Sequence, residues 1–256
     1  MNINEHIKLE KEEFVAKITL SKPPLNIFDS EDLIYLQEIL KNLNNEENLK
    51  LIVIDSNQKV FSAGVNISDH SKDKILRILG AFHEVFYTML DLSIPTMSLV
   101  KSGCFGGGSE LALFCDLIIA SENACFSHPE IKLGCYPPVS LVKLPELVGD
   151  KKALELILTG NKVSAYDALD LGMVNYVFKD EEFNQKTQEL INSIISNSSS
   201  VIKTTLKAYK GIHHSSLKEK LSISEKIYIE ELMSLEDAEE GIKSFLEKRL
   251  PLWKNK

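Results

Sequence analysis

The sequence predicts an α/β fold in which short strands alternate with helices. Three observations lead to this prediction. Apolar residues recur with the spacing of strands and of amphipathic helices in turn, as far along the chain as Phe178. The chain has 256 residues, 44% of them hydrophobic, so it can bury a sizeable core without disulfides. Strand, helix and strand in succession are typical of a largely parallel sheet.

At the N-terminus, the alternating runs Ile7–Glu10 and Phe14–Leu20 predict a hairpin of strands that ends at Lys22-Pro23-Pro24. Ser30 is the predicted N-cap of a helix whose apolar residues keep helical spacing as far as Leu43. The elements predicted next are a buried strand at Leu51–Asp55, a strand at Val60–Phe61, a helix from Lys74 to Leu90 and a strand at Pro95–Val100.

After the glycine cluster Gly103–Gly108, and most clearly beyond Gly134, the predicted elements become mainly helical. They are a short apolar helix at Ser109–Phe114, a strand at Asp116–Ala120, helices at Val139–Leu147, Lys151–Leu158 and Ser164–Leu171, a strand at Val174–Phe178, and helices alone from Glu181 onward. The polar run from Ser193 to Ser200 divides the chain into a core, residues 1–198, and a helical C-terminal region, residues 199–256.

Composition and charge argue against several classes of protein. Lys and Arg total 29 and Asp and Glu total 37, so a net charge of -8 predicts no general binding to nucleic acid. The first ten residues are polar and no apolar run reaches the length of a spanning helix, so we expect a cytoplasmic protein without membrane association. Without a CxxC pair, the cysteines are expected to be buried thiols rather than metal ligands: Cys104, Cys115, Cys125 and Cys135.

Two segments can present backbone N–H groups to an anion. Phe61–Val65 is a turn of small residues after a predicted strand, and Gly106–Gly108 opens a helix whose free N–H groups and dipole favour negative charge. Facing each other, two such donors would form an oxyanion hole for a thioester or ester oxygen, each donor contributing about 3 to 4 kcal/mol. The alternative is a packing turn. No P-loop, dinucleotide-binding or serine-hydrolase pattern fits these glycines.

Two carboxylates lie close to these segments in the sequence. Glu110 falls in the first turn of the helix after the glycines, among apolar neighbours, and Glu130 lies in the segment His128-Pro129-Glu130. A buried carboxylate needs a reason, which for Glu110 is either catalysis or the favourable helix dipole. For Glu130 the alternative is a solvated loop acid.

These motifs together resemble those of the crotonase (enoyl-CoA hydratase/isomerase) superfamily over nearly the whole chain. The segments that carry the resemblance are Phe61–Asn66, Lys101–Ala112, Cys115–Ala120, Phe126–Gly134, Leu158–Gly160 and Ala168–Val174. The resemblance implies a spiral of ββα units followed by a helical region that mediates trimer formation, with a homotrimer or homohexamer as the assembly. It also implies an acyl-CoA thioester substrate, with CoA as part of the substrate and no separate cofactor or metal.

By the same resemblance, the amides of Val65 and Gly107 form the oxyanion hole, and Glu110 and Glu130 hold a water molecule. Two carboxyls sharing one water can divide the work of acid and base and titrate as a coupled pair. The remaining candidates contact the substrate: Ala63, Gly64, Gly106, Tyr136 and Pro138 near the acyl group, and Lys248, Arg249 and Lys254 near the CoA nucleotide. Alternatively, these three cations only form the polar side of an amphipathic helix end.

One departure from the family pattern is Pro138, which stands where related hydratases have glycine. Because proline has no N–H, it cannot donate to the reactive water, so water positioning must differ locally. Together with Lys22–Ile27 and Ala63–His70, the Tyr136–Pro138 segment is similar to the branch that contains cyclohexa-1,5-diene-1-carbonyl-CoA hydratases. His70 and His128 are expected to be surface or satisfied core groups.

The resemblance therefore predicts a hydro-lyase that adds water reversibly to an unsaturated acyl-CoA, either an enoyl-CoA or a cyclic dienoyl-CoA. Two alternatives stay open at this point. A double-bond isomerase would need one glutamate as a proton shuttle, and a non-catalytic acyl-CoA-binding protein would need neither. The pocket walls are expected from the segment Ser71–Phe86 and from Tyr136.

Overall fold

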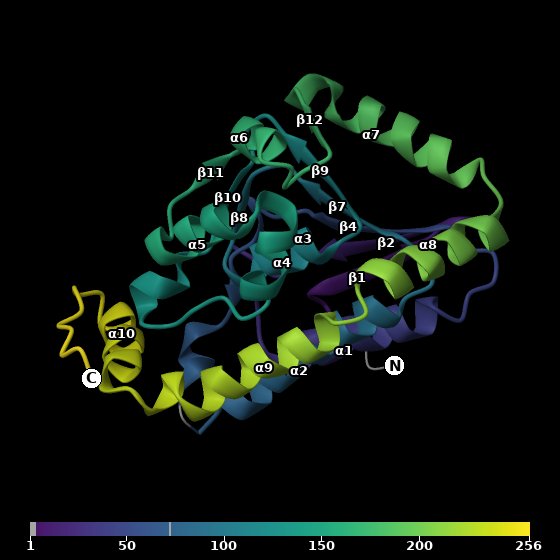
Figure 1. Ribbon diagram of the computed structural model, residues 1–256. Helices are drawn as coiled ribbons and strands as arrows, with labels where there is room; N and C mark the ends of the chain where they lie inside the picture. The colour runs from purple at the N-terminus through teal and green to yellow at the C-terminus, as the bar shows by residue number, and fades with distance from the viewer. Residues whose placement is uncertain (1–3, 72) are drawn as a thin grey trace.

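The computed structural model describes residues 4–71 and 73–256 and shows sheets with helices packed around them (Figure 1). The strands are β1 Ile7–Lys11, β2 Val15–Leu20, β3 Ile27–Phe28, β4 Leu51–Ser56, β5 Val60–Ser62, β6 Gly64–Val65, β7 Thr96–Val100, β8 Gly103–Phe105, β9 Leu117–Ser121, β10 Cys125–Ser127, β11 Val163–Ser164 and β12 Tyr176–Phe178. The helices are α1 Ser30–Leu43, α2 Ile75–Asp91, α3 Gly107–Phe114, α4 Ser140–Val148, α5 Asp150–Thr159, α6 Ala165–Asp170, α7 Asp180–Ile195, α8 Ser199–His213, α9 Leu217–Glu230 and α10 Glu236–Leu246, with 3-10 turns η1 Ile67–His70, η2 Pro129–Leu133 and η3 Leu232–Ser234.

The strands form a six-stranded sheet in the order β1-β2-β4-β7-β9-β12, a four-stranded sheet in the order β11-β10-β8-β5, and the pair β3-β6. Apart from the β1–β2 hairpin and the β10–β11 pair, neighbouring strands are parallel. Three times in succession the chain adds a strand to the large sheet and the next strand to the small one, as β4–β5, β7–β8 and β9–β10. This is the spiral that the sequence resemblance implies.

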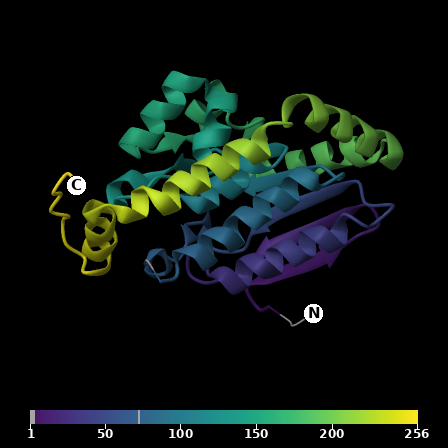
Figure 2. The ribbon, with the colours of Figure 1, turned by 60° about the horizontal axis from the view of Figure 1, so that its bottom comes forward.

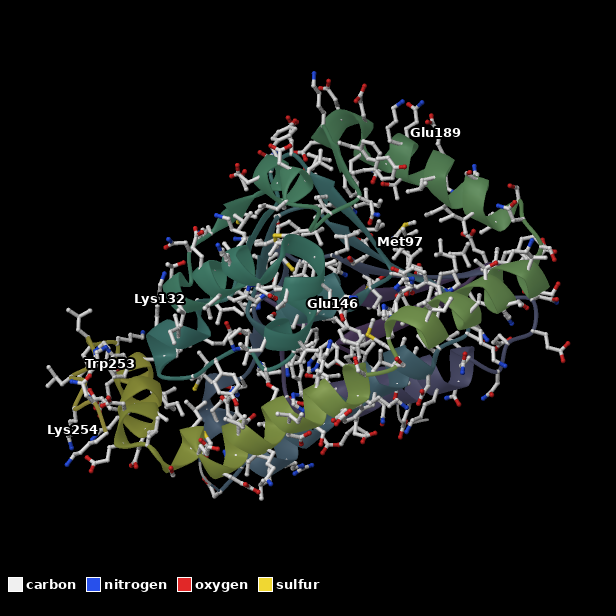
Figure 3. The ribbon with its side chains drawn as sticks, viewed as in Figure 1. Met97, Lys132, Glu146, Glu189, Trp253 and Lys254 are labelled. Carbon is white, nitrogen blue, oxygen red and sulfur yellow. The ribbon has the colours of Figure 1, made fainter. Side chains whose placement is uncertain are left out.

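The central strands of the large sheet, β4 and β7, are buried on both faces, which explains their continuous apolar runs. On one face, residues of β4, β7 and β9 pack against α7; they are Leu51, Val53, Met97, Leu99 and Ile119, with Phe183 and Ile191 from the helix. On the other face, α1 and α2 lie side by side, and α9 runs alongside α2 (Figure 2). Met97 lies between the sheet and α7 in Figure 3.

The predicted hairpin is confirmed, with Ile7 paired to Leu20 and alternate residues of β2 buried. The predicted N-cap is wrong by one residue. Asp29, not Ser30, caps α1, because its carboxylate accepts the N–H groups of Glu31 and Asp32 while the carboxylate of Asp32 accepts the N–H of Asp29. A carboxylate at this position also meets the positive end of the helix dipole.

The strands that the sequence does not predict are the short ones, β3, β6, β8, β10 and β11. Two or three residues carry no readable alternation, and these segments are extended because a partner strand pairs with them. The sequence predicts a helix that starts at Ser164. In the structure Ser164 is the last residue of β11 and the N-cap of α6, and its hydroxyl accepts a hydrogen bond from the N–H of Asp167.

From α7 onward the described elements are all helical, as predicted. The division at residue 198 stays a prediction, although Ser198 does precede α8. In the part of the chain that the structure describes, no helix is both long and apolar enough to cross a membrane.

Candidate active site

A pocket opens where α2, the start of α3, η2 and α9 converge. The residues that line it are Val65, His70, Ile75, Ile78, Leu79, Phe82, Gly107, Glu110, Glu130, Tyr136, Pro138 and Tyr228. Its cavity leaves about 40 Å³ for the centres of water-sized molecules. That exceeds the roughly 10 to 15 Å³ that one water needs. The pocket therefore brings together six of the residues that the sequence singles out.

The two predicted amide donors lie on one wall of this pocket. Gly107 is the first residue of α3, so its N–H has no partner within the helix. Asn66 N–H donates to Phe28 O at 3.0 Å, toward β3, and because successive amides of an extended strand alternate in direction, Val65 N–H points away from β3. The two loops touch: a Cβ atom on Gly64 would lie 2.8 Å from the Gly107 nitrogen.

Glu110 is buried, with 2% of its surface exposed. Its Oε1 accepts two hydrogen bonds of 2.8 Å, from the N–H groups of Val139 and Ser140 at the start of α4. Burial raises the pKa of Glu110 to about 7, because the two N–H donors that favour the carboxylate do not fully offset the lost hydration. Both donors bind Oε1, which leaves Oε2 for a ligand. The side chain thus serves the pocket rather than capping its own helix.

Glu130 stands in η2 with a different environment. Its Oε2 is buried and has no hydrogen-bond partner among the described residues. Burial, and then the nearby charge of Glu110, raises the pKa of Glu130 well above its usual range. The alternative of a solvated loop acid is therefore wrong. The two carboxyls share a pocket, so they titrate as a coupled pair, and burial raises the pKa of both.

Gly106 makes room for Glu130. Its φ is +54°, a left-handed conformation that favours glycine, and a Cβ atom there would lie 2.8 Å from Glu130 Oε1. Gly106 N–H donates to Ser127 O at 2.9 Å, and Gly106 O accepts the N–H of Glu110 at 3.0 Å. Gly106 adjoins the pocket but does not line it. Ala63 also adjoins the pocket without lining it, and its carbonyl oxygen would lie 4.0 Å from a Cβ atom on Gly106.

Tyr136 and Pro138 form part of the wall, as predicted for Tyr136 in particular. The Tyr136 hydroxyl donates to Ser224 O at 2.8 Å, and its ring meets Tyr228 edge-on, with the ring centroids 5.0 Å apart. Both partners belong to α9, so the helical C-terminal region closes one side of the pocket. The sequence shows these α9 residues only as part of a buried helical stripe, which does not distinguish a pocket wall from core.

The predicted wall segment around Ser71–Phe86 is confirmed, since α2 supplies four lining residues. The expectation for His70 is wrong: its ring lines the pocket, and burial lowers its pKa. His128 is buried as expected of a core residue, but its Nε2 has no partner among the described residues, and burial lowers its pKa to about 4. His128 is therefore neutral at physiological pH.

The three C-terminal cations do not reach the pocket within this chain. Arg249 pairs with Glu240 and Glu247, and Lys254 pairs with Glu236 at 2.9 Å. Lys254 lies with Trp253 on the C-terminal tail at one end of the molecule (Figure 3). Lys248 follows α10 in a left-handed conformation. A role for Lys248, Arg249 and Lys254 in nucleotide binding stays a prediction.

Comparison with known proteins gives consistent likenesses over nearly the full chain. A sequence model of the family described as enoyl-CoA hydratase/isomerase matches residues 10–256. The chain is 29% identical to a cyclohexa-1,5-dienecarbonyl-CoA hydratase of Thauera aromatica, over 97% of this chain and 96% of that protein. It is 32% identical to a short-chain-enoyl-CoA hydratase of Clostridium acetobutylicum, over 97% of each.

Solved structures agree with the predicted fold. An enoyl-CoA hydratase from Mycobacterium avium subsp. paratuberculosis superposes with a TM-score of 0.88 at 22% identity, over 98% of this chain and 99% of that one. An enoyl-CoA hydratase from Bacillus anthracis superposes with a TM-score of 0.78 at 27% identity, over 98% of this chain and 100% of that one. The spiral of strands and the helical C-terminal region are thus shared along the whole length.

Proposed function

The chain belongs to the enoyl-CoA hydratase/isomerase family, as its motifs indicated, and on this basis we propose that it adds water reversibly to an unsaturated acyl-CoA thioester. One observation carries the proposal. Two buried carboxyls, Glu110 and Glu130, share a water-sized pocket with the amides of Val65 and Gly107. CoA enters as part of the substrate, and no separate cofactor is part of the proposal.

In the proposed mechanism, the thioester oxygen accepts hydrogen bonds from Val65 N–H and Gly107 N–H. A water oxygen bonds to the β-carbon, the carbon–carbon double bond opens, and its electron pair moves toward the thioester oxygen to give an enolate. The two amides stabilise this charge, and each donor of such a pair contributes about 3 to 4 kcal/mol. A proton then bonds to the α-carbon and completes the addition.

The environments of the glutamates support a division of roles. Glu110 receives two N–H donors, which favour its ionised form, so we assign it as the base that takes a proton from the attacking water. Glu130 Oε2 has no hydrogen-bond partner among the described residues, and burial together with the charge of Glu110 raises the pKa of Glu130, so we assign it as the acid that protonates the α-carbon. After the addition, the proton that Glu110 has gained returns to Glu130 or to solvent.

For the acyl group we propose a short or cyclic chain, an enoyl-CoA or a cyclic dienoyl-CoA. The narrow cavity between Ile78, Leu79 and Phe82 supports a compact acyl group. The similarity to a hydratase named for cyclohexa-1,5-dienecarbonyl-CoA supports the cyclic one. We further propose a homotrimer or homohexamer, in which Lys248, Arg249 and Lys254 serve the CoA nucleotide.

The test is the initial rate at which enoyl-thioester absorbance disappears, measured with crotonyl-CoA and with cyclohexa-1,5-diene-1-carbonyl-CoA. Wild type is compared with Glu110→Gln and Glu130→Gln, and each variant should lose roughly 10² to 10⁴-fold in kcat. Gly80→Ala, on the solvent-accessible side of α2 with nothing within 4 Å of the added Cβ, is the matched control and should keep full activity.

Three other outcomes would contradict the proposal. A double-bond shift that needs only one glutamate would make the protein an isomerase. Binding of both thioesters without turnover would make it a non-catalytic acyl-CoA-binding protein. Full hydration by both glutamine variants would place the chemistry elsewhere. Preference for one of the two substrates decides between the short and the cyclic acyl group.

A further inference from the structure

Ser224 connects α9 to the segment that binds Glu110. Its side chain is buried, with 7% of the residue exposed, and its hydroxyl donates to Pro138 O at 2.9 Å. Its own carbonyl oxygen accepts the hydroxyl of Tyr136 at 2.8 Å. Ser224 thus holds the turn from Tyr136 to Pro138 at both ends.

The bond to Pro138 matters because of the peptide group to which that oxygen belongs. The Pro138 C=O and the Val139 N–H are the two ends of a single peptide unit. The Val139 N–H donates to Glu110 Oε1 at 2.8 Å. The three groups therefore form one chain of hydrogen bonds, from the Ser224 hydroxyl through the peptide to the carboxylate.

Hydrogen bonds in series polarise one another, by about 10 to 30% per bond. A donor on the Pro138 oxygen draws charge toward that oxygen and makes the Val139 N–H a stronger donor. Proline at position 138 gives no N–H to the pocket, but its carbonyl is the middle of this chain. The arrangement also fixes the plane of the peptide, and with it the direction of the N–H bond.

We propose that Ser224 is a positioning residue: its hydroxyl orients and polarises the Pro138–Val139 peptide so that this peptide holds the carboxylate of Glu110 in its ionised, water-accepting form. The proposal rests on the function proposed above, in which Glu110 is the base. Ser224 itself does not line the pocket. Its effect reaches the reaction only through Glu110.

Neighbouring contacts keep Ser224 in place. The carboxylate of the adjacent Glu225 accepts a 2.9 Å hydrogen bond from His83 Nδ1 of α2, and one turn later Tyr228 packs on Tyr136. The titratable groups that face Glu110 across the pocket are Glu130, His70, Tyr136 and Tyr228. The other charged neighbour of Ser224 on α9, Lys226, pairs with Glu230 at 3.9 Å.

The test is the pH profile of kcat/KM for Ser224→Ala against wild type. Without the hydroxyl, the Val139 N–H becomes a weaker donor, the pKa of Glu110 rises, and the acidic limb of the profile moves to higher pH by roughly half a pH unit. Near pH 6 this is a loss of roughly threefold in kcat/KM that disappears above pH 8. An unmoved limb would overturn the proposal, even if the variant were less stable.

Matched variants separate this effect from a general disturbance of α9. Ser222→Ala makes the same chemical change on the exposed side of the same helix and should leave the profile in place. Ser224→Thr keeps a hydroxyl and should restore the wild-type limb. If Ser224→Ala does not fold, Ser224→Cys replaces the hydroxyl by a weak thiol donor and should give a smaller shift in the same direction. A limb that shifts equally in the threonine variant would overturn the proposal.

A second readout does not depend on turnover. The titration of the Glu110 carboxyl is followed by ¹³C NMR on glutamate-labelled protein, with the signal assigned by its disappearance in Glu110→Gln. A higher midpoint in Ser224→Ala supports the proposal even if neither thioester is hydrated, in which case only the proposed function fails. An unchanged midpoint overturns the proposal even if hydration is observed.

Discussion

Glu130 lies directly against Gly106: a Cβ atom at position 106 would be 2.8 Å from Glu130 Oε1. Gly106 also has a φ of +54° and a ψ of -133°, and an L-residue in such a conformation is strained by about 1 to 3 kcal/mol. Because 2.8 Å is closer than a Cβ atom approaches a neighbouring heavy atom, the added methyl must displace the Glu130 carboxyl. The position of this carboxyl therefore depends on a glycine that does not itself line the pocket.

From this contact we expect Gly106→Ala to lower kcat by at least about tenfold, since a misplaced acid loses part of its catalytic contribution. Thermal unfolding and steady-state kinetics on the same samples measure both effects. Gly80→Ala is the control: it should gain roughly 0.5 to 1 kcal/mol in the free energy of unfolding, as expected within a helix, and keep its activity. Full activity of Gly106→Ala would show that Glu130 has room to move.

The ionisation of Glu110 predicts a pH dependence of stability. Its pKa is 4.5 in the unfolded chain and about 7 in the folded one. Between these values the folded state binds more protons than the unfolded state, so the free energy of unfolding falls as pH rises, by up to about 3 kcal/mol above pH 7. Glu110→Gln removes this loss and should be more stable than wild type at pH 8.

The measurement is urea unfolding of wild type and Glu110→Gln at pH 5 and at pH 8, at one protein concentration. The stability advantage of the glutamine variant should grow between the two pH values. For Gly80→Ala, which removes no titratable group, the difference from wild type should be the same at both. An advantage of Glu110→Gln that shrinks with pH would mean that Glu110 is stabilised as a carboxylate by folding.

Phe82 separates the pocket from an adjoining apolar cavity. Its ring lines both spaces and meets Phe86 edge-on, with the centroids 4.8 Å apart. Phe82→Leu should join the two spaces and raise the ratio of kcat/KM for a longer linear enoyl-CoA over crotonyl-CoA by about tenfold, because each accommodated methylene adds to binding. Phe86→Leu, whose side chain lines only the apolar cavity, should keep the wild-type ratio.

Asn26 connects the turn after β2 to the segment that carries Val65. It is fully buried, its side-chain amide donates to Phe61 O and Ser56 Oγ at 2.8 Å, and its main-chain carbonyl oxygen accepts the hydroxyl of Ser62 at 2.7 Å. Ser62 Oγ in turn accepts Gly64 N–H at 2.9 Å, one residue before the Val65 donor.

Removing the amide leaves buried carbonyls without donors, so Asn26→Ala should cost about 3 kcal/mol in the free energy of unfolding and lower kcat as well. Chemical denaturation and kinetics measure the two effects. Asn45→Ala, at an exposed position, should change stability by less than about 0.5 kcal/mol. A neutral Asn26→Ala would mean that water replaces the lost donors.

Long periodic segments were predictable, whereas most of the two- and three-residue strands were not. The helix α2 and the strand β4 follow from apolar spacing alone, because burial of a stripe or of a whole strand dictates it. The two-residue strand β6 carries no such pattern, and it is extended because β3 pairs with it. Several residues before α1 could cap it by sequence spacing. The structure identifies Asp29 as the N-cap, because Asp29 and Asp32 each accept a hydrogen bond from the other's backbone N–H.

The candidate residues could be named before the fold was known, because glycines that expose amides and a glutamate among apolar neighbours are recognisable from residue type, and the family resemblance added Glu130. The sequence pattern alone left a packing turn and a helix-dipole role open for these residues. The tertiary structure places Val65, Gly107, Glu110 and Glu130 in one pocket, closes one side of it with α9, and buries the two carboxyls so that the pKa of both is raised. The ionisation of a carboxyl depends on its burial and on its donors, and for Glu110 these come from residues far along the chain.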